Sequence, residues 1–413
     1  MSKLPLKMED LDKIVCEEIG IKMEYNDISH DIEIEDIGNV LGIYNPVTIL
    51  GDLPVILENY LSNDYTGCNS DKIAKLLSVI AGMNRYNPVE RMLSYCEWDG
   101  KSRFSELYDA LHIDDEFYQT LLRKGLIQCI SLALFNSLKK PFGADGMLVF
   151  KGSQGIGKTS LVSFLGHDPK LYKLGAYINP SDKDSVIMAT SAWITELGEL
   201  ETSLNKSDAE RLKAFITQDI DQYRPAYGRT YQKCPRHTTF MATCNSAKFL
   251  NDVTGSRRFW VIPVDDIDLD ALHKIDALQL WHEVAVLAKD DPQSFRLTAA
   301  ERNELERRNR DFQKTVTAQD EVEDIIHDAE NNPSEYKYVD CTITDFIMYH
   351  NALSRYSVKA VGAALDACDI TQKRKRNGER VSRVRCLPMP KSYTAAVYSS
   401  SKNNKAFGDT IPF

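Results

Sequence analysis

The residues with the clearest chemical meaning form a glycine-rich segment, Gly-Ser-Gln-Gly-Ile-Gly-Lys-Thr, at positions 152–159. The segment matches the pattern G-x-x-x-x-G-K-[ST], in which backbone N–H groups of a loop surround phosphate oxygens. We expect Lys158 to reach the β and γ phosphates and Thr159 to bind Mg²⁺. The predicted nucleotide contacts are Gly152, Ser153, Gln154, Gly155, Ile156, Gly157, Lys158, Thr159 and Ser160. The pattern therefore predicts binding of ATP or GTP with Mg²⁺.

Polar residues that follow later apolar runs suggest how the triphosphate is hydrolysed. Glu196 ends one such run, and we predict that it is the acid linked to Mg²⁺. Glu199 is the candidate base that activates water, although Glu199 and Glu201 also suit the solvated start of a helix. Asn245 follows another run, where an amide is suited to orienting water, and the alternative is an ordinary asparagine turn.

Two adjacent arginines, Arg257 and Arg258, precede the apolar run that ends at Val264. A guanidinium in this position is suited to stabilising charge on the nucleotide of a neighbouring subunit. The pair therefore suggests an arginine finger, and the sequence does not distinguish which of the two acts.

Two basic segments have the composition of nucleic-acid contacts. The first alternates basic side chains and aromatic rings around a proline and a glycine, which is typical of a loop that contacts single-stranded nucleic acid. Its candidates are Arg224, Tyr227, Arg229, Tyr231 and Lys233. The second is a basic turn near the C-terminus, for which the alternative is a solvated hairpin. It contains Lys373, Arg374, Lys375 and Arg376, with Arg380, Arg383 and Arg385 nearby.

The elements around the glycine-rich segment predict an α/β fold. A short apolar run at 147–150 precedes it and an amphipathic stretch at 160–165 follows it, so the order is strand, loop, helix. A helical pattern covers 117–138, and further strands are expected at 192–195, 239–244 and 258–264. These runs are typical of a sheet covered by helices.

The chain is long enough for two or three units. We expect a helical N-terminal domain at 1–110, a P-loop ATPase core at 111–298, a helical linker with a winged-helix-like basic domain at 299–391, and a mobile tail at 392–413. The break before the last compact unit is expected near 330, where Asn331-Asn-Pro interrupts the helical pattern.

Composition restricts the class of protein further. The formal net charge is −10, so any DNA contact has to be local. The nine cysteines include no C-x-x-C pair, which argues against a zinc ribbon. No apolar stretch is long enough for a membrane span or a signal peptide. We therefore expect a cytoplasmic protein that does not bind membranes.

Three segments together resemble a known family. They are "WDGKSRF" at 98–104, "RPAYGR" at 224–229 and "FLNDVTGSRRFWVIPV" at 249–264. With the P-loop they look like the virulence-associated protein E family of phage and mobile-element ATPases, over about residues 85–290. That family is similar to superfamily 3 helicases. The resemblance implies an AAA-like homo-oligomeric ring, usually a hexamer, that hydrolyses ATP at subunit interfaces while it translocates on single-stranded DNA.

The resemblance also assigns residues. It gives the nucleotide-side roles to Lys158, Thr159, Glu196, Asn245, Arg257 and Arg258, and Lys213 in "RLKAFITQD" resembles a helicase-core lysine that we place with the DNA contacts. The expected function is a replicative helicase acting on single-stranded or forked DNA beside a separate primase. The alternatives are an ATP-dependent origin-binding initiator and a DNA-binding regulatory module, both without unwinding activity.

Overall fold

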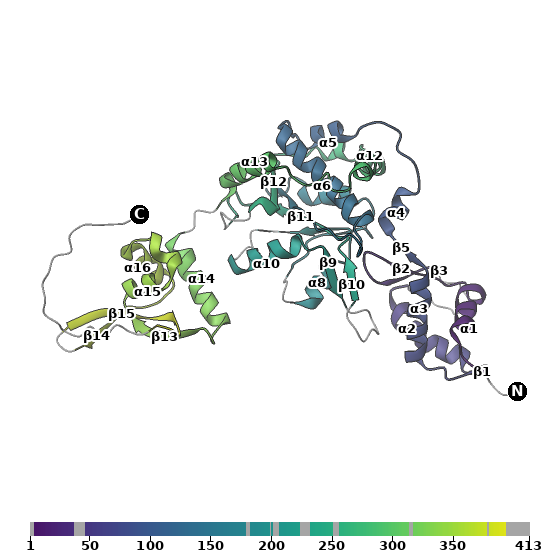
Figure 1. Cartoon of the computed structure of the whole chain (residues 1–413), viewed down its shortest axis with the longest axis horizontal. Coiled ribbons are helices and arrows are strands. Elements are labelled where there is room, and N and C mark those ends of the chain that lie inside the picture. The colour runs from purple at the N-terminus through teal and green to yellow at the C-terminus, as the bar shows by residue number, and fades with distance from the viewer. Residues whose placement is uncertain are drawn as a thin grey trace. The chain divides into compact units, whose positions relative to one another are not determined.

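The computed structural model describes residues 4–36, 46–178, 182–198, 200, 206–223, 232–250, 256–313, 317–377 and 380–393. The chain divides into two compact units, Met1–Lys314 and Thr315–Phe413 (Figure 1). The site described below lies in the first unit. In the described part of the chain, no helix combines the length and the apolar character needed to cross a bilayer.

The N-terminal part of the first unit has an apolar cluster of its own, which runs from Leu6 to Ala81. Its helices are α1 (Met8–Asp12), η1 (Lys13–Glu18), α2 (Pro46–Leu61) and α3 (Ser70–Met83). Its strands are β1 (Leu4–Pro5), β4 (Tyr65–Thr66), β2 (Lys22–Asn26), β3 (Ile32–Asp36) and β5 (Arg85–Tyr86), the last three forming one sheet. The segment is therefore not wholly helical as predicted, because Ile32-Glu-Ile-Glu alternates with the period of a strand.

A five-stranded parallel sheet forms the centre of the first unit, in the order β12-β6-β11-β8-β7. The strands are β6 (Met147–Lys151), β7 (Tyr172–Lys173), β8 (Ile194–Leu197), β11 (Thr239–Cys244) and β12 (Phe259–Pro263). The inner strands are buried along nearly their whole length, which explains their continuous apolar sequences. The parallel α/β core is confirmed, and only the short edge strand β7 was not predicted.

Helices cover both faces of this sheet (Figure 1). Leu148 and Phe150 share one apolar cluster with α6 (Glu116–Leu134), α7 (Lys158–Gly166) and α12 (Ala277–Asp290). Met147 and Val149 point to the other cluster. That cluster includes side chains of α8 (Lys183–Ala189) and α10 (Lys206–Ile216). The alternation along β6 thus places α7, which begins at the glycine-rich loop, against one face.

Shorter elements complete the first unit. They are α4 (Pro88–Leu93), α5 (Phe104–Ala110), the antiparallel pair β9 (Ile220–Tyr223) and β10 (Gln232–Pro235), η3 (Ser256–Arg258), α11 (Leu269–Leu272), α13 (Ala299–Asn309) and η4 (Arg310–Phe312). The domain boundary predicted at residue 299 is not observed, because α13, which begins at Ala299, packs on the core of the first unit. Asn309 is fully buried there and its Nδ2 donates hydrogen bonds to the carbonyls of Ser256, at 2.9 Å, and Phe259, at 3.0 Å.

The second unit has the element order of a winged helix. It contains α14 (Ala318–Asn331), β13 (Tyr336–Cys341), α15 (Ile343–Tyr349), η5 (Asn351–Arg355), α16 (Val358–Ala367), β14 (Lys373–Asn377) and β15 (Arg380–Pro390). The strands form an antiparallel sheet in the order β13-β15-β14. This confirms the winged-helix-like prediction. The break expected near 330 lies inside the unit, since Val322 of α14 packs in the same core as Phe346. The predicted tail lies outside the described residues, except for 392 and 393.

Candidate functional site

A pocket of about 570 Å³ lies where the glycine-rich loop meets the ends of β8 and β11. Its walls are Gln154, Gly155, Gly157, Lys158, Thr159, Ser160, Leu174, Gly175, Glu196, Gly198, Thr243 and Asn245. Because the strands are parallel, their carboxyl ends meet at one edge of the sheet. The topology therefore brings together residues that are far apart in the sequence.

Three glycines shape the loop for two different reasons. Gly155 and Gly157 have φ values of +88° and +93°, which favour glycine over residues with a Cβ. Gly152 is needed for space, because a Cβ at this position would lie 2.1 Å from the carbonyl oxygen of Val264. The loop then enters α7, whose N-terminal N–H groups suit an anion.

Lys158 connects the loop to the end of β11. Its side chain is buried, and Nζ donates hydrogen bonds to the carbonyls of Gly152, at 2.8 Å, and Ser153, at 2.6 Å. Nζ also donates to Oδ1 of Asn245, at 2.9 Å. The charge is thus fixed inside the pocket, and the amide predicted to orient water lies directly beside it.

Glu196 is a carboxylate with only 1% of its surface exposed. Oε1 accepts hydrogen bonds from the hydroxyls of Thr159, at 3.0 Å, and Thr243, at 2.9 Å, and Oε2 accepts from the N–H of Gly175, at 3.3 Å. These bonds offset the cost of burying the carboxylate. Sequence reasoning missed Thr243 and Gly175, because neither stands in a recognisable pattern.

The oxygen atoms around Glu196 fit a magnesium ion. Mg²⁺ prefers hard oxygen ligands and commonly takes only one or two from the protein, with the phosphates supplying others. The buried carboxylate of Glu196 and the hydroxyl of Thr159 meet this requirement at hydrogen-bonding distance from each other. In the described ranges, this site included, no group of three or more His, Cys, Asp or Glu side chains is arranged to hold a metal ion.

Arg257 and Arg258 lie at the opposite edge of the sheet from this pocket. They end η3 just before β12, and Phe259 is paired with Met147 at the start of β6, whereas the loop follows Lys151 at its end. Five residues of strand separate the two edges by about 15 Å. The two arginines instead line a second pocket of about 240 Å³, together with Arg296 and Arg302. Arg257 is exposed and Arg258 half-buried.

The residues predicted to contact DNA have different outcomes. Four of them lie outside the described residues: Arg224, Tyr227, Arg229 and Tyr231. Glu199, the candidate base, also lies outside the described residues. Lys233 is exposed on β10, opposite Gln222 of β9. Lys213 has only 3% of its surface exposed within α10, because the helix packs this side against the core. Its predicted role as a DNA contact is corrected, since a buried ammonium cannot reach a DNA phosphate.

The base of the β9–β10 hairpin is fixed by a residue that sequence reasoning missed. Arg236 is almost fully buried and forms an ion pair with Asp221 of β9. It also donates a hydrogen bond to the carbonyl of Phe215, at 3.2 Å, and its guanidinium lies 4.5 Å from the centre of the Phe215 ring. A single arginine before an apolar strand gives no pattern from which this position is predictable.

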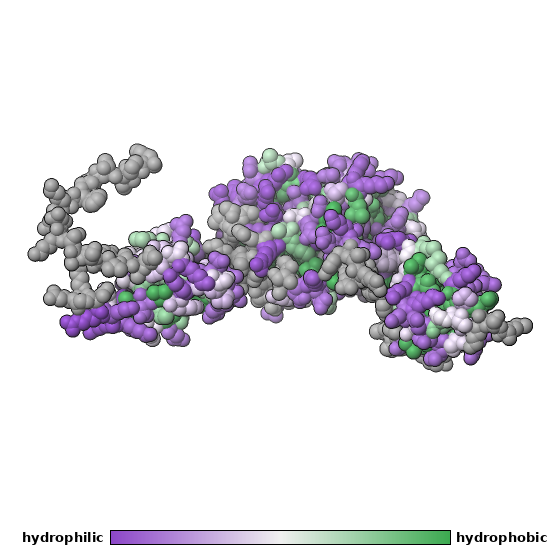
Figure 2. Space-filling model, turned by 60° about the horizontal axis from the view of Figure 1, so that its bottom comes forward, coloured by the Kyte–Doolittle hydropathy of each residue, from purple (hydrophilic) through white to green (hydrophobic). Residues whose placement is uncertain are grey.

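The basic strand β14 lies on the surface of the second unit. Lys373, Arg374, Lys375 and Arg376 are all exposed, with Lys375 3.5 Å from Asp340. Figure 2 shows strongly hydrophilic residues, in purple, at the left end of the second unit, where Figure 1 labels β14. Arg385 on β15 differs, because it is buried and forms an ion pair with Asp366 at 2.7 Å. The basic surface therefore consists mainly of β14.

Fold and site together define the class of the first unit. Counted along the chain, its sheet has the strand order 5-1-4-3-2, with the P-loop after the first strand and Glu196 near the end of the third. This is the arrangement of an AAA-like P-loop domain.

Comparison with known proteins gives the family. Residues 93–314 match the virulence-associated protein E-like domain, and the chain belongs to this family. The resemblance stated from the sequence is thereby confirmed.

We also compared the chain with solved structures and with curated proteins. The chain is similar to apo structures of the NrS-1 C-terminal region, one at 11% identity and a TM-score of 0.45, another at 12% and 0.44. Each alignment covers 91% of this chain and 98% of the other. A search of curated proteins found no match.

Proposed function

We propose that this protein is a Mg²⁺-dependent ATPase of the superfamily 3 helicase type, which acts on single-stranded or forked DNA during phage or mobile-element replication. One observation carries the proposal: Lys158, Thr159, Glu196 and Asn245 converge on one pocket. Hydrogen bonds join Lys158 to Asn245 and Thr159 to Glu196. Membership of the virulence-associated protein E-like family supports the link to mobile elements.

In this proposal the residues divide the work of phosphoryl transfer. The loop N–H groups and Lys158 hold the phosphates and stabilise the charge that develops on the γ phosphate. Thr159 and Glu196 hold Mg²⁺, which neutralises charge on the β and γ oxygens when bound. Asn245 orients the attacking water, and Glu199 remains the proposed base.

The arginine pair supports a site completed between subunits. Arg257 and Arg258 are too far from the P-loop of their own chain to reach its nucleotide, because a full strand length separates the two. In a homo-oligomeric ring, which we propose to be a hexamer, a head-to-tail contact repeats around the axis. Such a contact brings this edge of one subunit to the P-loop pocket of the next.

Strand separation of a forked duplex by the purified protein tests the proposal. Wild-type protein is expected to unwind the fork with ATP and Mg²⁺. Lys158→Ala is expected to lose both hydrolysis and unwinding, while Lys170→Ala, which removes an exposed lysine between α7 and β7, is expected to keep both. ATP hydrolysis without strand separation would contradict the helicase, and absence of hydrolysis would contradict the ATPase.

The second unit favours a second candidate, an ATP-dependent origin-binding initiator. The observation behind it is the exposed basic strand β14 on a winged-helix fold, since basic surfaces of this kind contact DNA phosphates. Replacing Lys373 and Arg374 by glutamate is expected to weaken DNA binding, and Lys391→Glu, at an exposed position after β15, is the matched control. Loss of sequence-specific binding with unchanged hydrolysis would support the initiator. Unchanged binding would exclude β14 as the DNA surface.

A further inference from the structure

A cysteine, a histidine and a glutamine form a cluster outside the site described above. Cys96 is exposed in the loop 94–103, between α4 and α5, and its Sγ lies 3.3 Å from Nε2 of His282 on α12. The side-chain Nε2 of Gln279, also on α12, donates a hydrogen bond to the same sulfur, at 3.4 Å. A nucleophile within hydrogen-bonding distance of a base is the arrangement that activates a thiol.

The amide of Gln279 is oriented by the backbone of the loop. Its Oε1 accepts a hydrogen bond from the N–H of Asp99, at 2.9 Å, and its Nε2 donates to the carbonyl of Glu97, at 3.0 Å. These two bonds define which end of the amide is the donor. The N–H groups therefore face the sulfur, where a hydrogen bond favours the thiolate over the neutral thiol. Gln279 also lies in the first turn of α12, whose positive end favours an anion.

His282 is suited to take the proton that the thiol loses. Only 8% of its surface is exposed, and within the described ranges its one hydrogen-bond partner is the thiol of Cys96. Burial lowers the pKa of the imidazole below its usual value, although Asp276 and Glu97 act in the opposite direction. The ring is therefore neutral at pH 7, and Nε2 accepts a proton when the ring hydrogen is on Nδ1.

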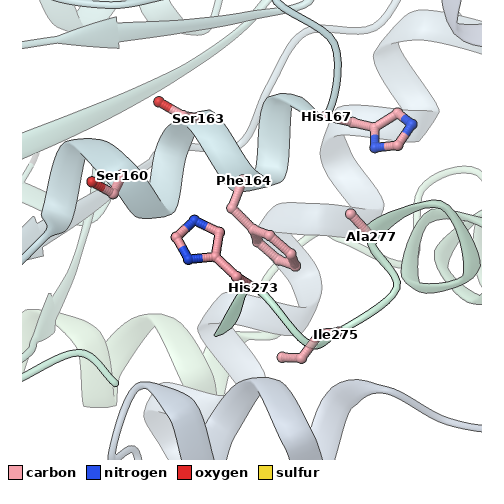
Figure 3. A pocket seen from close by; sticks show the side chains of 7 residues that line it. All are labelled: Ser160, Ser163, Phe164, His167, His273, Ile275 and Ala277. Carbon is pink, nitrogen blue, oxygen red and sulfur yellow. The ribbon is translucent and has the colours of Figure 1, made fainter. Parts of the chain in front are cut away.

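The start of α12 is held in place from the side away from this loop. Trp281 is fully buried, and its Nε1 donates a hydrogen bond to the carbonyl of Leu165, at 2.8 Å. Its ring centre lies 4.5 Å from that of Trp193. The segment 273–277, which leads into α12, lies across a pocket from Phe164 of α7 (Figure 3). The two side chains beside the thiol are thus positioned before a reagent arrives.

The charges near the sulfur restrict the kind of reagent. Glu97 follows Cys96 in the chain, and Asp276 caps the start of α12; both carboxylates are exposed. Asp99 is compensated by its ion pair with Arg103. The remaining negative charge repels anions, such as acidic disulfides, and does not repel an uncharged molecule.

We propose that Cys96 is a redox modification site, at which a small uncharged peroxide converts the thiol into a sulfenic acid. The thiolate sulfur attacks one oxygen of hydrogen peroxide, so an S–O bond forms while the O–O bond breaks. Sulfur is oxidised by two electrons and the peroxide is reduced. The proton taken up by His282 passes to the departing hydroxide, which leaves as water. This inference goes beyond the proposed function and does not depend on it.

Treatment of the full chain with hydrogen peroxide and dimedone, which labels sulfenic acids, tests the proposal. Peptide mass spectrometry locates the label, and Cys386 is the internal control because it is the other exposed cysteine. At pH 7, Cys96 is expected to be labelled at least about tenfold faster than Cys386. Gln279→Met removes the donor and His282→Leu removes the base, and each is expected to lower this ratio at least about threefold.

Two results would overturn the proposal. The first is equal labelling of Cys96 and Cys386 in the wild-type protein. The second is an unchanged ratio in both variants, because the surroundings of the thiol would then not activate it. Cys129 is buried, so the absence of label on it shows that a variant is folded. If His282→Leu fails this check, the wild-type ratio and Gln279→Met, at a half-buried position, decide.

Discussion

At the scale of single residues, Glu196 shows how hydrogen bonds accommodate a buried carboxylate. Two hydroxyl groups and one backbone N–H surround its carboxylate. Glutamine is nearly isosteric with glutamate, so Glu196→Gln removes the charge and keeps the size and shape of the side chain. This replacement therefore separates the structural role of Glu196 from its proposed catalytic role.

Glu196→Gln is expected to bind ATP but to hydrolyse it at least about 100-fold more slowly, because the acid that we propose to hold Mg²⁺ loses its charge. Steady-state phosphate release and calorimetry measure the two properties. Glu201→Gln is the control acid from the same stretch of sequence. Wild-type hydrolysis by Glu196→Gln would contradict the assignment.

At the scale of elements, the β9–β10 hairpin is joined to the core by the buried pair of Arg236 and Asp221. Breaking a buried pair leaves one charge without compensation, which costs far more than losing a pair on the surface. The hairpin carries Lys233 and flanks the basic aromatic segment. The Arg236–Asp221 pair therefore links the stability of the fold to the proposed DNA contacts.

Arg236→Met is expected to lower the free energy of unfolding by about 3 kcal/mol or more, because Asp221 stays buried without its partner. Adding Asp221→Asn to Arg236→Met is expected to recover part of the loss. Arg307→Met, which breaks an exposed pair with Glu304, is expected to cost less than about 1 kcal/mol. Urea denaturation measures all three, and equal effects of the two arginine variants would contradict the burial argument.

The turn between β2 and β3 predicts a dependence of stability on pH. Burial lowers the pKa of His30 from 6.5 to about 4, with a further contribution from His237. The folded protein therefore favours the neutral ring. Stability is complete above pH 6.5 and falls as the pH drops towards 4, because the unfolded chain takes up the proton first.

Between pH 7 and pH 5, this histidine is expected to remove about 2 kcal/mol from the free energy of unfolding. His30→Asn suits the positive φ of 59° at this position and is expected to lose less stability over the same range. Urea denaturation at the two pH values gives the comparison. An identical loss in both proteins would show that His30 does not titrate as described.

At the scale of the whole molecule, the arginines and the P-loop lie at opposite edges of one sheet. A monomer therefore cannot complete the proposed site, and hydrolysis should depend on assembly. Arg257 is the exposed member of the pair and Arg258 is half-buried, so we expect Arg257 to be the finger.

Mixing inactive variants tests this dependence. Lys158→Ala and Arg257→Ala are each expected to be inactive alone, whereas a 1:1 mixture restores hydrolysis at about a quarter of the interfaces by random assembly. The Arg258→Ala mixture is the comparison. Absence of recovery in both mixtures would argue against sites shared between subunits, and recovery only with Arg258→Ala would assign that residue as the finger.

The sequence by itself was enough to predict the features of this protein that depend only on residues close together in the chain. The glycine-rich loop needs particular residue types in consecutive positions, and buried parallel strands need short apolar runs, so both were predictable. The winged-helix order followed from a helical period, a basic turn and an alternating strand. Contacts between distant segments leave no such pattern.

Only the tertiary structure decided which of these residues meet. It placed Thr243 and Gly175 on Glu196, buried Lys213, and paired Arg236 with Asp221. It also assigned α13 to the first unit and α14 to the second. The reason is that strand order and helix packing set these contacts, and neither is encoded by the spacing of residues along the chain.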